Sequence, residues 1–351
     1  MSNFTAAQVI VNITVQYTIY GYSIILLLGI FGNTMNITIF QGLKVFKRNQ
    51  CTFYILIESI ANFAVLIIAL PFRVAEYAFS FDLTQRSVVW CKIRPMISQS
   101  LALIAFSAVC FAAFDQYLAT NHHGWIRKFS NIQLARRSMI ISTLIWSIYN
   151  CIFLYFFDLK DNVGCVISNN DFARYYSFGH FIVLNGLFPL SVAGSFSVLA
   201  YWNVRRIVQL RIAVTRRKLD KQLTAMILAK VIFFVGSILP AILFRIYILN
   251  VTVDRNDSLR ISVHNLISSF AYSLFYMNSS VSVELKKFSL KTSFRFQCTF
   301  YVFLLVSSRF RRQVKASILA MFSHLQVFCL STRHNQIRPN LSERSEFDGS
   351  T

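Results

Sequence analysis

The chain has 351 residues, of which 55% are hydrophobic and only 14% are charged, and its formal net charge is +21. This composition excludes an ordinary soluble domain, whose charged fraction is about 25%. It also disfavours a nucleic-acid-binding protein, because Lys and Arg stand in short clusters between uncharged runs that are long enough to cross a membrane.

Seven segments predict membrane-spanning helices. A helix that rises about 1.5 Å per residue needs about 20 residues to cross a hydrocarbon core of about 30 Å. In chain order the predicted spans are residues 17–40, 51–72, 95–117, 138–157, 175–204, 223–249 and 261–282, the last joined to 298–308. The predicted fold is therefore all-α, an integral membrane bundle of seven transmembrane helices over residues 17–308. It lies between an N-terminal segment, residues 1–16, and a tail, residues 309–351.

The distribution of basic residues predicts the orientation of the bundle. The short loops after the first, third and fifth spans are rich in Lys and Arg, whereas residues 1–16 contain neither. Because such basic loops face the cytoplasm, we expect the N-terminus outside and the tail inside. The Asn-x-Ser/Thr sequons at Asn3 and Asn12 agree with this orientation and predict a glycoprotein.

Particular residues mark individual spans. In chain order they are Asn33, the triplet Asp115-Gln116-Tyr117 at the end of the third span, Trp146, Pro189 and Pro240. In kind, order and place they resemble the landmark residues of the rhodopsin-like (class A, family 1) G-protein-coupled receptors. The resemblance extends from about residue 20 to residue 315.

The resemblance implies a disulfide bond. In the family, a cysteine at the outer end of the third helix is joined to one in the second outer loop, and Cys91 and Cys165 hold these two places. Such a bond would tie the loop to the helix and suits an oxidising exterior. The alternative is that both are unpaired thiols among the seven cysteines of the chain.

The sequence departs from the family pattern at residues whose contacts change when a receptor of the family is activated. Gln116 replaces an arginine, and a neutral amide cannot form the family's ion pair with an acid on the sixth helix such as Asp220. Asp115 and Tyr117 remain available for local hydrogen bonds. Asn62 stands where the second helix usually carries an aspartate, so a sodium site there would lack its charge. These differences indicate a divergent member, an invertebrate orphan receptor of the peptide-receptor type.

The seventh span is interrupted by residues 283–297, which contain four basic residues and one acidic residue. Each charge near the centre of a bilayer costs about 2.5 to 3.5 kcal/mol. Removing the segment joins Ser282 to Cys298 and brings Tyr301 to the place of the tyrosine in the family's switch motif. Our hypothesis is an unspliced intron. The alternative is a genuine basic insertion that ends the seventh span at Ser282.

The resemblance implies a function in signalling. We expect a plasma-membrane receptor that transmits an extracellular ligand signal to a heterotrimeric G protein, with no cofactor, metal, nucleic-acid partner or enzymatic activity. The ligand is unknown, a peptide being one candidate. The candidate pocket residues are Gln99, Tyr176, His180, Arg245 and Tyr247. Each could instead anchor its helix at the membrane interface, Arg245 by snorkelling to water.

Two other functions stay open. A transporter or channel would have repeated halves or paired charges within the membrane; we expect neither, because Glu58 and Lys230 are predicted near the cytoplasmic ends of separate spans. A receptor-like protein that no longer signals is favoured by Gln116 and by the interrupted seventh span. G-protein activation and solute flux would separate the three.

Overall fold

The computed structural model describes residues 2–42, 50–79, 84, 86–160, 164–207, 214–251 and 257–280. All of them lie in one compact unit, Met1–Val306. The predictions made for residues 283–297, 298–308 and 309–351, and for Tyr301, lie outside the described residues.

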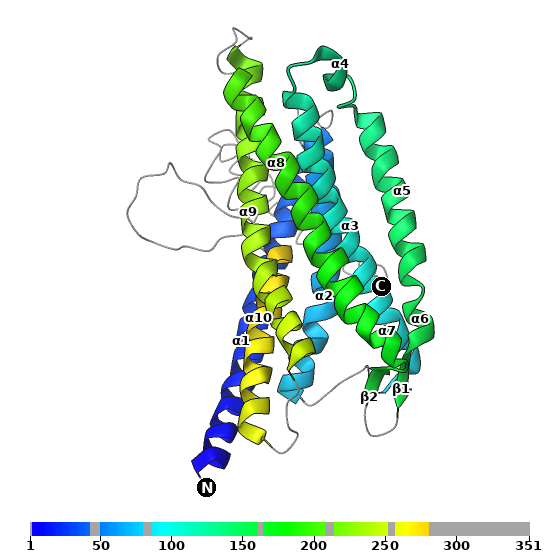
Figure 1. The fold of residues 1–351 in the computed structure, drawn as a ribbon, viewed down its shortest axis with the longest axis vertical. Coiled ribbons are helices and arrows are strands. Elements are labelled where there is room, and N and C mark those ends of the chain that lie inside the picture. The colour runs from blue at the N-terminus through cyan, green and yellow to red at the C-terminus, as the bar shows by residue number, and fades with distance from the viewer. Residues whose placement is uncertain are drawn as a thin grey trace, which may run out of the picture. The chain divides into compact units, whose positions relative to one another are not determined.

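The described chain is almost entirely helical (Figure 1). In chain order the helices are α1 (Ser2–Gly42), α2 (Gln50–Phe79), α3 (Val88–Thr120), α4 (Gly124–Arg127), α5 (Ile132–Asn150), α6 (Phe153–Phe156), α7 (Asn170–Tyr175), η2 (Tyr176–Leu187), α8 (Phe188–Ile207), α9 (Val214–Asn250) and α10 (Ser258–Ser280). Two short strands, β1 (Phe157–Lys160) and β2 (Gly164–Ile167), form an antiparallel hairpin between α6 and α7.

Six helical stretches within the described residues are long and apolar enough to cross a membrane. They are Ala6–Thr38, Gln50–Phe79, Val88–Thr120, Ile132–Phe156, Asn170–Arg205 and Ile227–Asn250. Helix α10, which corresponds to the first part of the seventh predicted span, is more polar but packs against α1, α2 and α9. Its 23 residues span about 35 Å at about 1.5 Å per residue, enough to cross the core. The all-α membrane bundle that the sequence predicts is therefore confirmed.

Large apolar side chains on the outer faces of several helices fit a lipid solvent. Leu27 of α1, Ile148 of α5 and Trp202 of α8 are all exposed. In water such an exposed apolar surface would favour aggregation. In a bilayer it has no unfavourable solvation free energy, provided that the backbone groups are hydrogen-bonded internally as in a helix.

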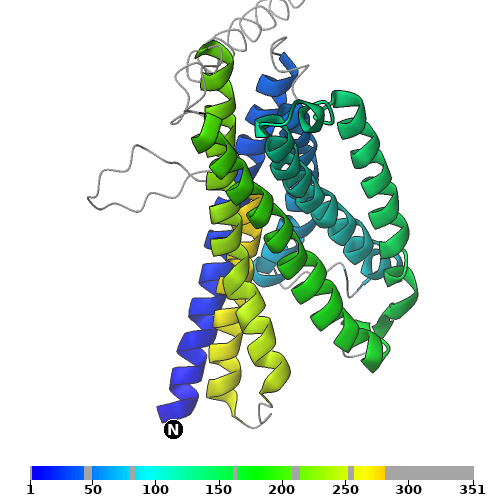
Figure 2. The same ribbon diagram turned by 45° about the horizontal axis from the view of Figure 1, so that its top comes forward.

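Figures 1 and 2 show how the two ends of the bundle differ. The start of α1 and the β1–β2 hairpin lie at one end, and α4 lies at the opposite end. Following the predicted orientation, we call the first the outer end and the second the inner end.

The first and fifth spans differ from their predicted forms. Helix α1 begins at Ser2, well before residue 17, because residues 2–16 contain no Gly, Pro or charged residue that would end or disfavour a helix. The fifth span is built from α7, η2 and α8, and η2 is a π-helix, in which the Phe188 amide donates to the carbonyl of Val183. Hydropathy cannot distinguish the two helical forms.

Two apolar cores lie within the described part of the bundle. One lies where α3, η2, α9 and α10 meet and is centred on Phe106, Phe181 and Phe234; the other joins α1 to α2. Gly186 lets η2 approach α9, because a Cβ atom there would clash with Ile242. Small residues are common where membrane helices contact one another, because they leave room for side chains of the neighbouring helix.

Candidate functional site

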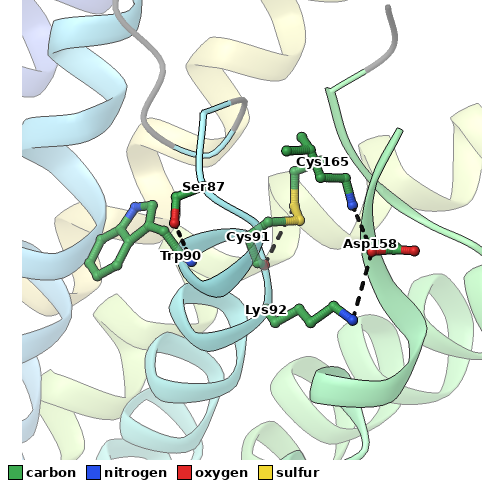
Figure 3. Close-up of a disulfide and its surroundings, with 7 residues drawn as sticks. Ser87, Trp90, Cys91, Lys92, Asp158 and Cys165 are labelled. Carbon is green, nitrogen blue, oxygen red and sulfur yellow. Dashed lines mark hydrogen bonds and ion pairs between the residues drawn. A yellow bond between two sulfur atoms is a disulfide. The ribbon is translucent and has the colours of Figure 1, made fainter. Parts of the chain in front are cut away.

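A disulfide joins the outer end of α3 to the hairpin. Cys91, in the first turn of α3, is bonded to Cys165 of β2, with a Cα–Cα distance of 5.6 Å (Figure 3). Ser87 caps this helix end, since its hydroxyl accepts from the Trp90 amide at 3.3 Å. Lys92 and Asp158 of β1 add an ion pair at 3.7 Å, but both side chains are substantially exposed, so the pair contributes little. The covalent bond therefore positions the hairpin.

A hydrogen-bonded network lies one to two turns further into the bundle. The Gln99 amide of α3 donates to the hydroxyl of Tyr176 at 3.3 Å. Its oxygen is 3.2 Å from Nε2 of His180 and accepts from Asn185 at 3.1 Å. We call Gln99, Tyr176, His180 and Asn185 the outer polar network. It brings together three of the predicted pocket residues, and it joins α3 to η2.

The surroundings of His180 define its tautomer. An amide oxygen only accepts, so Nε2 of His180 must donate to Gln99. Nδ1 then accepts from the hydroxyl of Tyr149, 3.3 Å away. The imidazole stacks on the rings of Tyr149 and Tyr176 and meets the edge of Phe153. His180 is fully buried, and a neutral ring in this tautomer satisfies both of its nitrogens.

The other two predicted pocket residues are placed differently. Arg245 of α9 donates from Nη2 to the hydroxyl of Ser177 at 2.6 Å, and so borders the outer polar network. Tyr247 does not reach it: its hydroxyl is 3.2 Å from Nε2 of His264. Tyr247 instead lines a separate groove of about 570 Å³ between the outer ends of α9 and α10.

The predicted landmarks make contacts between helices. Asn33 donates from α1 to the carbonyl of Ser279 in α10 at 2.9 Å. Trp146 of α5 donates to the hydroxyl of Ser107 in α3 at 2.8 Å. Pro189 and Pro240 lie within α8 and α9, where each removes one backbone donor. Polar contacts of this kind are a normal means of joining helices in lipid.

At the inner end, the triplet on α3 contacts several neighbours. The Ser130 hydroxyl donates to the buried Asp115 at 2.7 Å. Gln116 is also buried and lies close to the thiol of Cys51 on α2. Tyr117 packs against Phe196 of α8, with ring centroids 5.6 Å apart. The side chain of Asp220 lies outside the described residues, as does that of Asn3, whereas Asn12 is exposed on α1.

An ion pair joins α2 to α9 near the inner end. Lys230 donates to Glu58, and Asn62 donates to the other oxygen of the same carboxylate at 3.3 Å. The side chains of Lys230 and Glu58 are only 14% and 6% exposed. We call Glu58, Asn62 and Lys230 the inner ion-pair cluster. Both charges lie within spans, so the expectation that no intramembrane charges pair is wrong.

The sequence contained a signal for this pair that was not used. Glu58 is the single charge within residues 51–72, and Lys230 stands nearly alone in its span at a similar distance from the inner end. Two opposite charges at matching depth in apolar helices cost least when they meet. Asn185 and Tyr149 carried no comparable signal, since a single polar residue on a helix does not identify its partner.

Comparisons with known proteins give partial similarities. No protein-family model matches the chain. A stretch of 127 residues, 36% of this chain, is 26% identical to the probable G-protein coupled receptor 34 of Mus musculus, of which it covers 32%. A stretch of 132 residues, 37% of this chain, is 26% identical to galanin receptor type 1 of Homo sapiens, of which it covers 36%. The galanin receptor type 1 of Rattus norvegicus is 25% identical over a stretch that covers 37% of each chain.

The matches thus span 32% to 37% of the length of these curated relatives. All of these relatives are G-protein-coupled receptors, and this supports the resemblance to the class A family.

Proposed function

We propose that this chain is a divergent rhodopsin-like receptor of the plasma membrane that transmits an extracellular ligand signal to a heterotrimeric G protein. The observation that carries the proposal is that one helix, α3, joins two polar sites. Gln99 takes part in the outer polar network, and Asp115 and Gln116 lie at the inner end of the same helix. The partial similarity to receptors supports the same function.

In this proposal the inner ion-pair cluster holds the resting state. The family's pair between the third and sixth helices is replaced by a pair between α2 and α9, in which Lys230 of α9 supplies the positive charge. Ligand binding at the outer end favours a state in which α9 has moved and the pair has opened. Gln116 therefore does not abolish the resting lock, because the charges have been relocated.

The test is nucleotide exchange by purified G proteins. The full-length protein in nanodiscs is mixed with Gα subunits of the main classes and Gβγ, and binding of a non-hydrolysable GTP analogue is measured. We expect a low basal rate, raised several-fold by Glu58→Gln, which opens the pair. The matched control is Glu76→Gln, which breaks an exposed pair with Arg73 on the same helix. If no Gα class shows nucleotide exchange with the unaltered protein or any variant, the receptor function is rejected.

A transporter remains the second candidate, because a buried pair of opposite charges within spans is a feature of ion and proton pathways. Proteoliposomes loaded with a pH-sensitive dye distinguish it. Proton or ion flux that is lost in Lys230→Met would favour a transporter, whereas absent flux together with nucleotide exchange favours the receptor.

The finer points of the proposal need separate tests. We propose that residues 283–297 derive from an unspliced intron, and that the receptor is an invertebrate orphan with a peptide ligand. Sequencing of the messenger across the codons for Ser282 and Cys298 tests the first point. If nearly all transcripts retain the segment, the non-signalling alternative gains weight. Endoglycosidase treatment tests the outer position of the N-terminus. It should remove glycans from the unaltered protein expressed in cells but not from the variant that carries both Asn3→Gln and Asn12→Gln.

A further inference from the structure

A cavity of about 480 Å³ opens between α3, α5 and α8, within their membrane-spanning stretches. Its floor is formed by buried side chains of α3, among them Leu103 and Phe106. Its rim carries Ile141 and Ile145 of α5 and Phe188 of α8, which are exposed. Figures 1 and 2 show α5 standing apart from α8 towards the inner end, with α3 between them. The cavity therefore opens sideways to the hydrocarbon of the bilayer rather than to water.

The size and lining of the cavity restrict what can occupy it. Its volume falls within the range of about 300 to 1,000 Å³ that is typical of small-molecule sites. None of the described residues that line it is charged, and apart from three serines the lining is almost entirely apolar. A charged group that entered would lose its hydration and gain no counterion. The occupant must therefore be lipophilic and uncharged.

One polar side chain of the cavity has no partner. Ser142 of α5 is only 8% exposed, and its hydroxyl has no hydrogen-bond partner within the described part of the chain. It lies roughly 15 Å along α5 from the start of the helix at Ile132, well inside the span. A hydroxyl at this depth is costly unless an oxygen or nitrogen atom meets it. An oxygen of an occupant can supply that partner.

Two further hydroxyls line the same cavity. Ser138 lies one turn before Ser142 on the same side of α5, and its hydroxyl also has no partner among the described residues. Ser107 of α3 accepts from Trp146 at 2.8 Å, and its own hydroxyl hydrogen has no acceptor in that part of the chain. Three hydroxyls about one helical turn apart can hydrogen-bond with several oxygens of one ligand.

We propose that the cavity binds an uncharged acyl lipid from the bilayer, a fatty acid ester of a polyol such as a monoacylglycerol. The ester carbonyl and the free hydroxyls of its head bond to Ser107, Ser138 and Ser142, and its acyl chain lies along the apolar floor on α3. A sterol has a single hydroxyl at one end, so its rings would cover the remaining serines without bonding to them. A fatty acid or a phospholipid would bring a charge that the lining does not match.

Binding of such a lipid requires only the membrane bundle. It therefore goes beyond the proposed receptor function, and it holds whether or not the protein activates a G protein.

Photochemical labelling tests the proposal. The full-length protein in nanodiscs of phosphatidylcholine is irradiated with increasing amounts of a monoacylglycerol that carries a diazirine in its acyl chain, and labelled peptides are identified by mass spectrometry. We expect labelling that saturates, that is concentrated in the cavity-lining parts of α3, α5 and α8, and that unlabelled monoacylglycerol displaces. A free fatty acid and a sterol with the same photoreactive group are the comparison probes, and each should label these peptides about tenfold less.

Variants test the residues. Ser142→Leu fills part of the cavity and removes the hydroxyl, and should reduce the saturable labelling about tenfold or more. Its thermal unfolding should be unchanged or shifted upward, because an apolar side chain replaces an unpartnered hydroxyl. The matched control is Ser147→Leu, the same change on α5 at a residue that does not line the cavity. Should Ser142→Leu fail to fold, Ser142→Ala removes only the hydroxyl and should weaken binding about threefold or more.

Three results would each overturn the proposal. Labelling that does not saturate, or that spreads equally over other lipid-facing helices such as α1, would show ordinary contact with the bilayer. Stronger labelling by the sterol or the fatty acid probe would assign a different class of ligand. Equal labelling of Ser142→Leu and Ser147→Leu would show that the lipid is not held in this cavity.

Discussion

The two ends of the bundle are stabilised by different kinds of interaction. At the outer end a disulfide and several neutral hydrogen bonds connect α3, η2 and the hairpin. A single residue of this end, His180, has polar contacts to both Gln99 and Tyr149. At the inner end α9 is tied to α2 by one charged pair, Lys230 with Glu58. A distributed network yields only when several contacts are lost, whereas a single pair can open in one step. Under the proposed receptor function, the preorganised outer end is the end that would bind the ligand, and the inner end is the end that would change state.

The disulfide provides the largest expected effect. Cys91→Ala should lower the free energy of unfolding by about 4.5 kcal/mol, because the bond closes a long loop, with a sequence separation of 74. Unfolding of the purified protein, with and without reductant, measures it. The control is Cys151→Ala, at an exposed free cysteine. If the two variants unfold alike, the outer end does not depend on the covalent bond.

The inner ion-pair cluster gives the next effect. Glu58→Gln should cost about 3 kcal/mol, because it leaves Lys230 as a buried charge without a counterion. The double variant Glu58→Leu with Lys230→Met removes both charges and should recover most of the loss. Glu76→Gln, which breaks an exposed pair, should cost less than about 1 kcal/mol. A double variant that is as unstable as Glu58→Gln would contradict a role for the pair itself.

The outer polar network can be broken at its centre. Gln99→Leu leaves the donors of His180 and Asn185 without their acceptor and should cost about 2 kcal/mol. Equilibrium unfolding in mixed micelles measures the loss. Gln133→Leu, at an exposed position of α5, should change stability by less than about 0.5 kcal/mol. Equal losses in the two variants would mean that the network does not preorganise this end.

A single contact between helices gives the smallest effect. Trp146→Phe keeps the aromatic bulk but removes the donor to Ser107, and should cost about 1 kcal/mol. The matched variant Trp202→Phe lies on an exposed face of α8 and should be neutral in the same unfolding assay. A neutral Trp146→Phe would show that α5 is held by packing alone.

Much of the fold was accessible from the sequence, because a bilayer imposes a length on every apolar helix. The spans followed from that length. The start of α1 did not, since residues 2–16 precede the predicted span yet contain no Gly, Pro or charged residue that would end a helix. The π-helix was also beyond reach, because α- and π-helical backbones bury the same kinds of residue and differ in hydrogen-bond register.

The candidate site was partly accessible. Gln99, Tyr176 and His180 were expected near one another because they occupy the outer parts of neighbouring spans, and the structure joins them by hydrogen bonds. Tyr247 was grouped with them at the right depth but faces His264 on a different side of α9. Depth can be read from distance along a span, whereas the rotation of each helix about its own axis depends on packing against residues far away in the chain. The pairing of Lys230 with Glu58 depended on the same rotation.

The length of α1 has a mechanical consequence. Its 41 residues correspond to about 60 Å of helix, roughly twice the thickness of the hydrocarbon core. Its membrane part is joined to α10 at separate heights, where the hydroxyl of Tyr22 donates to the carbonyl of Ser269 at 2.8 Å and Asn33 to that of Ser279 at 2.9 Å. A rod fixed at two heights transmits torque along its length. A partner that binds the first turns of α1 would therefore also exert force on α10.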